Sequence, residues 1–260
     1  MSAGGAEGAR VDGTWRAPVV GVLGGLGPAA TAVFLDLLVR ATDAASDQEH
    51  LDLLVSQHST TPDRTAHILD ESAADPGPVL ARDAAMLERA GVGLLVLPCN
   101  TAHHFVRRIE AVTSVPFVSI VDATVEVAAQ SVGAGGTVAV FATEGNIHAR
   151  VYQDALEARG LRALVPDGEL QARINTLIYD QVKANRPVDR GLFERCVAEA
   201  VALGAGTVVL GCTELSVIYD QHGFRADERL TDSLTELARQ TVLRAHKELA
   251  PAFARQTPAP

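Results

Sequence analysis

The chain has 260 residues, enough for one large or two modest domains, and its 47% hydrophobic and 21% charged residues are ordinary for a globular protein. The formal net charge of −10 at pH 7 argues against nucleic acids and anionic membranes as partners, because both bind positively charged surfaces. Three cysteines are too few for a disulfide framework in a chain of this length.

Neither the amino terminus nor any later segment reads as an export or membrane signal. Residues 1–16 have no apolar core, and no apolar run approaches the roughly 18 residues of a membrane-spanning helix. We therefore expect a cytoplasmic protein whose thiols stay reduced. Residues 1–16 and 251–260 are expected to be flexible tails.

Short apolar runs alternate with amphipathic segments along the chain. The runs are rich in Val and Leu and almost continuously apolar, which is typical of parallel strands covered on both faces. After the first run, residues 28–41 keep Phe34, Leu37 and Leu38 at helical spacing behind Pro28, a residue suited to a first turn. This alternation predicts an α/β protein with parallel sheets. The predicted strands are 18–25, 51–57, 93–98, 115–120, 137–143, 163–166 and 207–211.

The chain also contains an internal repeat about half its length. AMLERAGVGLLVLPCNTAHHF, around Cys99, matches CVAEAVALGAGTVVLGCTELSVI, around Cys212, and each predicts a helix, a turn, a strand, a cysteine and a new helix. VVGVLGGLGPAAT and TVAVFATEGNIHA begin the two halves in the same way. The repeat predicts two similar Rossmann-like parallel-sheet domains related by a pseudo-twofold axis. Ligands of such folds bind beyond the carboxyl ends of the strands, so the active site is expected in the cleft between the domains.

The domain boundaries follow from the repeat, since no linker marks them. We expect the first domain to comprise residues 17–120 together with 231–250, whose last helix returns to pack on the first half. The second domain is expected to comprise residues 121–230.

Cys99 and Cys212 each lie between a predicted strand and a predicted helix. The first turn of a helix presents free N–H groups and a positive dipole end, which lower the pKa of a thiol and attract anions. Asn100, Thr101 and Thr213 add side-chain donors at the same places. Two thiols facing one ligand suit inversion of a stereocentre, because a base on one face and an acid on the other can exchange roles.

Other interpretations of these residues are weaker. A buried cysteine is often only a small core residue, and we assign that role to Cys196, which lies within a predicted helix. Cys99 and His103 have a spacing that could bind zinc or activate a hydrolytic nucleophile. However, no third ligand cluster accompanies them, and a hydrolytic site would leave Cys212 unexplained. We therefore expect no metal.

Cofactor binding is also not expected. The only lysines are Lys183 and Lys247, and neither follows a predicted buried strand, so a pyridoxal phosphate Schiff base is not expected. The loop GVLGGLGPAA partly matches a dinucleotide fingerprint, but Ser56 and Gln57 end the second strand where an acidic residue is needed.

Several motifs resemble one known family. They are GVLGGLGPAAT (21–31), DQEH (47–50), PDRTAHIL (62–69), PCNTAH (98–103), FATEGNI around Thr143, and GCTEL (211–215). With these motifs the chain resembles the aspartate/glutamate racemase superfamily, the pyridoxal-phosphate-independent two-cysteine racemases, and most resembles the microbial aspartate racemase branch. The resemblance extends over nearly all of the chain between the two expected tails.

The resemblance implies roles for individual residues. Cys99 and Cys212 match the catalytic acid/base pair. Arg64 matches an arginine that helps to bind the distal carboxylate, for which a bidentate guanidinium is well suited. The other implied substrate-binding residues are Asn100, Thr101 and Thr213, at the α-carboxylate and ammonium, with Thr143 and Gly25 in the two strand-end loops. The resemblance further implies a homodimer that needs no cofactor.

One position departs from the family pattern. The aspartate branch typically has a lysine in the segment matching GELQARINTLIY (168–179), where it assists the arginine. Our alignment places Ala172 there, with Arg173 beside it. Either Arg64 is sufficient, or Arg173 substitutes, or the substrate lacks a second simple carboxylate.

These observations predict an amino-acid racemase acting on aspartate, glutamate or a related acidic amino acid by proton transfer at Cα. The alternatives are a racemase of a different or modified amino acid, or a maleate isomerase or decarboxylase reaction on the same scaffold. A non-catalytic amino-acid-binding protein is a further alternative.

Overall fold

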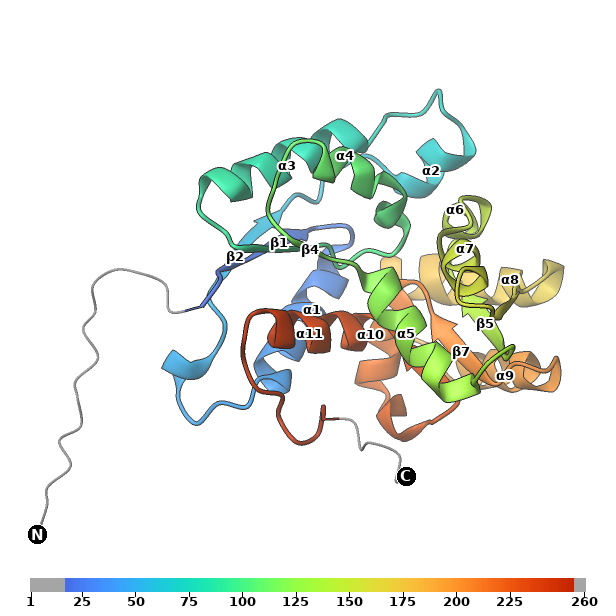
Figure 1. Ribbon diagram of the computed structural model, residues 1–260. Coiled ribbons are helices and arrows are strands. Elements are labelled where there is room, and N and C mark those ends of the chain that lie inside the picture. Colours follow the sequence, from blue (N-terminus) through green and yellow to red (C-terminus); the bar gives the residue numbers. More distant parts are fainter. Residues whose placement is uncertain (1–16, 255–260) are drawn as a thin grey trace, which may run out of the picture.

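The structure, a computed structural model, describes residues 17–254 and contains two four-stranded parallel sheets (Figure 1). This confirms the predicted α/β class. The first sheet has the order β2-β1-β3-β4 and the second the order β6-β5-β7-β8, so the strands of the two halves follow one topology. The strands are β1 (Val20–Gly24), β2 (Leu53–Gln57), β3 (Leu94–Val96), β4 (Phe117–Val118), β5 (Thr137–Phe141), β6 (Arg162–Leu164), β7 (Thr207–Leu210) and β8 (Leu230–Asp232).

Each of the seven predicted strands is present, and β8 is an addition. β8 pairs in parallel with β7, with Val208 opposite Leu230 and Leu210 opposite Asp232. The sequence did not reveal it because it is only three residues long and two of them are polar, Thr231 and Asp232.

Helices follow most strands, as parallel sheets require. In the first half they are α1 (Pro28–Ala41), η1 (Asp47–Glu49), α2 (Arg64–Leu69), α3 (Gly77–Arg89), η2 (Thr101–Phe105) and α4 (Val106–Glu110). Beyond β4 they are α5 (Ile120–Val132), α6 (Glu144–His148), α7 (Val151–Glu157), α8 (Gly168–Asn175), η3 (Thr176–Lys183), α9 (Arg190–Ala202), α10 (Thr213–Gln221), η4 (Phe224–Ala226) and α11 (Ser233–Arg244). Among these, η3 is a π-helix, while η1, η2 and η4 are 3₁₀-helices.

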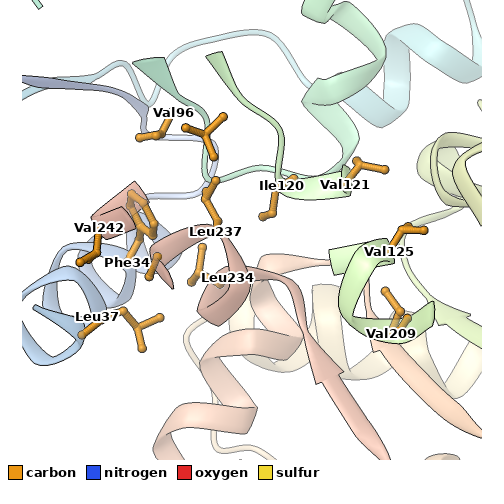
Figure 2. Packing of buried hydrophobic residues seen from close by; sticks show 14 of the residues in the cluster. Phe34, Leu37, Val96, Ile120, Val121, Val125, Val209, Leu234, Leu237 and Val242 are labelled. Atoms are coloured by element: carbon orange, nitrogen blue, oxygen red, sulfur yellow. The ribbon is translucent and has the colours of Figure 1, made fainter. Parts of the chain in front are cut away.

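The last helix joins the two halves. α11 follows β8 of the second sheet and packs against both α1 and α5 (Figure 1). Figure 2 shows Leu234 and Leu237 of α11 beside Phe34 of α1, within one buried cluster that also includes Val209 of β7. One core is therefore shared by both sheets, and the domain boundaries and the twofold relation remain predictions. The expected tails, 1–16 and most of 251–260, lie outside the described residues.

Within residues 17–254, none of the helices is both long enough and apolar enough to cross a membrane.

Candidate active site

The two repeat cysteines lie at equivalent places and line one cavity. Cys99 follows β3 and Cys212 follows β7, the third strand of each half, and both side chains are buried. The cavity that they line is small. Seven of the eight predicted site residues line it: Cys99, Cys212, Arg64, Asn100, Thr101, Thr143 and Thr213.

Gly25, the eighth predicted residue, lines an adjoining and larger cavity. Its neighbour Leu26 reaches the inner cavity instead. The two cavities have four lining residues in common, which are Asp63, Arg64, Lys183 and Glu214. A side chain bound between the cysteines would therefore meet these charged groups at the junction of the two cavities.

A chain of threonine hydroxyls connects the two halves at the cavity. Thr143 caps α6, its Oγ1 accepting from the backbone N–H of Asn146 at 3.2 Å. The same Oγ1 lies 3.0 Å from Oγ1 of Thr101 and accepts from Oγ1 of Thr65 at 3.3 Å. These contacts fix the hydroxyls at the start of two short helices, so donors for an anionic ligand are oriented before it binds.

Asn100 is held by partners from the second half of the chain. Tyr152 donates from its hydroxyl to Asn100 Oδ1 at 2.5 Å, and Asn100 Nδ2 donates to Ser233 Oγ at 3.0 Å. Burial raises the pKa of Tyr152 above its ordinary value, so this hydroxyl remains a donor. Ser233 in turn donates to the carbonyl of Leu210 at the end of β7. The amide beside Cys99 is thus oriented by the strand that precedes Cys212.

Cys212 is the N-cap residue of α10 and contacts a carboxylate. Its Sγ donates to Oε2 of Glu214 at 2.9 Å. Burial raises the pKa of Cys212 well above its ordinary value, and the negative charge of Glu214 raises it further, while Lys183 lowers it. The expectation that the helix start lowers the pKa of this thiol is therefore wrong, because burial and the Glu214 carboxylate outweigh the backbone N–H of Glu214, which lowers it.

His103 is bound to the backbone on both sides of its ring. Nδ1 donates to the carbonyl of Cys99 at 2.8 Å, and Nε2 accepts from the backbone N–H of Ile120 at 3.1 Å. Burial lowers the pKa of His103 to about 4, so the ring is neutral at pH 7. Because both ring nitrogens are occupied, His103 is unsuited to bind zinc or to activate Cys99. The helix after Cys99 also begins as the 3₁₀-helix η2 rather than as an α-helix.

Lys183 is one of the cavity-lining residues that the sequence patterns did not predict. It ends the π-helix η3 and lines both cavities together with Arg64. Burial lowers the pKa of Lys183, but the negative charge of Glu214 and smaller contributions from other acidic neighbours outweigh burial, and the net pKa is raised. The hydrogen bonds of a π-helix run from residue i to i+5 rather than to i+4. The spacing of an α-helix therefore does not predict which side of η3 carries this lysine.

Arg173 does not substitute for the lysine that the aspartate branch typically has at the position of Ala172. It forms ion pairs with Glu199 and Glu169, and neither it nor Ala172 lines the cavity. Arg64, in contrast, donates from Nη1 to the carbonyls of Thr61 and Pro62 and, among residues 17–254, forms no ion pair. The cations available to a ligand are therefore Arg64 and Lys183.

Comparison with known proteins identifies the family. A family model described as Asp/Glu/hydantoin racemase matches residues 23–241. The chain belongs to the Asp/Glu/hydantoin racemase family. This confirms the predicted enzyme class, a racemase, and does not favour the maleate isomerase, decarboxylase or binding-protein alternatives.

Individual relatives are similar to this racemase in sequence or in fold over most of their length. The broad specificity amino-acid racemase RacX of Bacillus subtilis is 26% identical over 228 residues, which cover 86% of this chain and 96% of RacX. The solved Picrophilus torridus aspartate racemase is 25% identical, with a TM-score of 0.76 and coverage of 91% of this chain and 97% of that one. An aspartate racemase homologue from Pyrococcus horikoshii, 23% identical, shares the fold with a TM-score of 0.70 over 88% of this chain and all of its own.

Proposed function

We propose that this racemase interconverts the L and D enantiomers of an acidic amino acid, aspartate or glutamate, by proton transfer between Cys99 and Cys212. The observation that carries the proposal is the single cavity in which the two repeat cysteines meet Arg64 and Lys183. The likeness to the Picrophilus torridus aspartate racemase supports the substrate class.

The proton transfer needs one thiolate and one thiol. The thiolate removes the Cα proton and becomes a thiol, while the opposite thiol donates its proton to the other face of the carbanion and becomes a thiolate. Atoms and charge balance, and the two cysteines have exchanged protonation states. Both proton-transfer groups thus come from the chain itself, and we propose that the reaction needs no cofactor.

Two groups of donors would bind the substrate. Asn100, Thr101, Thr143 and Thr213 would hold the α-carboxylate and stabilise the negative charge that develops there when Cα loses its proton. At the junction of the two cavities, Arg64 and Lys183 would bind the distal carboxylate and would thereby favour an acidic side chain.

We also propose a cytoplasmic homodimer, as the family resemblance implies. Sedimentation of the purified chain at enzymatic concentrations tests the dimer, and a monomer that retains full activity would contradict it.

The function is tested by following solvent deuterium into Cα of aspartate and glutamate, with circular dichroism reporting inversion. We expect exchange and inversion in the native chain and neither in Cys99→Ala or Cys212→Ala. Cys196→Ala, which removes a buried thiol of the core rather than of the cavity, is the matched control and should remain active. Exchange that persists in the double variant of Cys99 and Cys212 would contradict the mechanism.

A further inference from the structure

Glu214 is a buried carboxylate whose closest polar contact is a thiol. Its side chain is 6% exposed, and its Oε2 accepts from Cys212 Sγ at 2.9 Å and from Thr213 Oγ1 at 3.5 Å. Among residues 17–254, Glu214 takes part in no ion pair, and Lys183 acts on it only at longer range. Burying a charge without a close partner is costly, so the position of this carboxylate against Sγ calls for a functional explanation.

The internal repeat is broken at this residue. With the two cysteines aligned, Asn100 corresponds to Thr213 and Thr101 corresponds to Glu214. The residue two positions after Cys99 is therefore Thr101, whose neutral hydroxyl is hydrogen-bonded to Thr143. The residue two positions after Cys212 is Glu214, which has a carboxylate. The two halves supply equivalent thiols in unequal surroundings.

We propose that Glu214 is a positioning residue that keeps Cys212 in its thiol form before substrate binds, so that Cys99 begins as the base and Cys212 as the acid. This inference rests on the proposed function for its catalytic meaning. A Cys212 thiolate would place a second negative charge against the carboxylate, whereas the thiol donates a hydrogen bond to it.

The other groups around Cys212 do not cancel this effect. Lys183 on η3 favours the thiolate, but the combined influence of burial and Glu214 exceeds it. Tyr179 on η3 and Tyr152 on α7 are neutral, because burial raises the pKa of both phenols.

The remaining charged groups that line the cavity come from α2 and its cap. Arg64 and Asp63 are adjacent, of opposite sign, and Asp63 is engaged as the N-cap of α2 through the N–H of Ala66. Glu214 is therefore the charged group in direct contact with the Cys212 thiol.

The inequality has a consequence for turnover. From the resting form, the Cys99 thiolate takes the Cα proton and Cys212 delivers its own proton to the opposite face, which leaves a thiolate beside Glu214. After product leaves, solvent returns a proton to Cys212 and accepts one from Cys99. One enantiomer should thus react directly with the resting enzyme, and the other should react only with the less populated form.

The direct test measures ionisation without substrate. The chain is labelled with carbon-13 at cysteine Cβ, and the chemical shift of each cysteine is followed against pH. We expect Cys99 to ionise at lower pH than Cys212 in the native chain. In Glu214→Gln the midpoint of Cys212 should fall by at least about one pH unit, since a like charge in contact is removed, and that of Cys99 should stay in place.

Glu144→Gln is the matched control, because Glu144 is also in the first turn of a second-half helix but is exposed and lines neither cavity. It should leave both midpoints unchanged. Cys212 ionising before Cys99 in the native chain would overturn the proposal and requires no variant to fold. An unchanged Cys212 midpoint in folded Glu214→Gln would overturn it as well.

A kinetic test shows whether Cys99 is the base and Cys212 the acid in the first turnover. With enzyme in excess over aspartate, one enantiomer should react at least about tenfold faster than the other in the first turnover, and Glu214→Gln should reduce that ratio. Equal first-turnover rates in the native chain would overturn the assignment of base and acid. Absence of any amino-acid racemisation would contradict the proposed function instead, while the order of thiol ionisation would still stand as measured.

Discussion

Arg64 and Lys183 are the side chains that can distinguish an acidic substrate from a neutral one. Arg64 keeps its guanidinium free of carboxylate partners within residues 17–254, and it lines the junction of the two cavities together with Lys183. A planar guanidinium can bind a carboxylate through two parallel hydrogen bonds, whereas an ammonium acts as a point charge. The arginine should therefore contribute more to substrate selection than the lysine.

We expect Arg64→Ala to lower kcat/KM for aspartate on the order of 100-fold, as the loss of about 3 kcal/mol of charged hydrogen bonding implies. Lys183→Ala should lower it roughly tenfold. Steady-state racemisation kinetics measure both changes. Arg173→Ala is the control, because Arg173 pairs with Glu199 outside the cavity and its loss should change kcat/KM by less than about twofold. Equal effects of the Arg64 and Arg173 substitutions would contradict the assignment.

Sequence patterns predicted some residues of this site and missed others. The repeat predicted Cys99 and Cys212 because both follow apolar strands, and strand ends of equivalent topology meet at one place. Lys183 was not found because it stands in the polar stretch VKANRP and is directed by a π-helix. The role of Glu214 was not predicted because acidic residues are common in the first turn of helices. No sequence pattern distinguishes one that contacts a thiol from one that is exposed to solvent.

Among the structural elements, the turn between β1 and α1 requires a glycine. Gly25 has a φ of +91°, and a Cβ at this position would lie 2.6 Å from backbone atoms of His58. Its N–H also donates to Thr31 Oγ1 at 3.0 Å, which ties the turn to the first helix. Both the backbone angle and the available space therefore require glycine here.

Gly25→Ala should lower the free energy of unfolding by roughly 2 kcal/mol or more, since it combines a strained backbone with a clash against backbone atoms that cannot move aside cheaply. The matched control is Gly91→Ala, where φ is +89° but nothing lies within 4 Å of the added Cβ. That variant should lose only about 1 kcal/mol, from the backbone angle alone. Urea unfolding measures both values, and equal losses would show that the contact with His58 does not matter.

Elements were predicted where their hydrophobic period was clear. The runs that became β1, β5 and β7 are almost continuously apolar and almost fully buried, and such apolar runs are the strongest signal that a sequence gives for these strands. β8 and η3 gave no such signal, because one is a short and partly polar strand whose pairing with β7 decides its structure, and the other departs from the period of an α-helix.

At the scale of the whole molecule, the largest hydrophobic cluster is shared by the two halves, and each half adds a smaller cluster of its own. α11 supplies Leu234, Leu237 and Val242 to the shared cluster, where they meet Phe34 and Leu37 of α1 and residues of both sheets (Figure 2). A core that is contiguous across both halves couples their unfolding, so the chain should unfold in a single cooperative transition.

Thiol exposure gives a readout from each half, because Cys99 follows β3 of the first sheet and Cys212 follows β7 of the second. We expect both cysteines to become reactive over the same range of urea concentration in a Cys196→Ala background. Leu237→Ala should shift both midpoints downward together by destabilising the fold by about 3 kcal/mol, since it removes a fully buried leucine from the shared cluster. Leu243→Ala is the control on the same helix, because Leu243 is 44% exposed and its loss should have little effect on either midpoint. If Leu237→Ala moved only one of the two midpoints, the halves would be independent folding units, and the active site between them would depend on docking rather than on a common core.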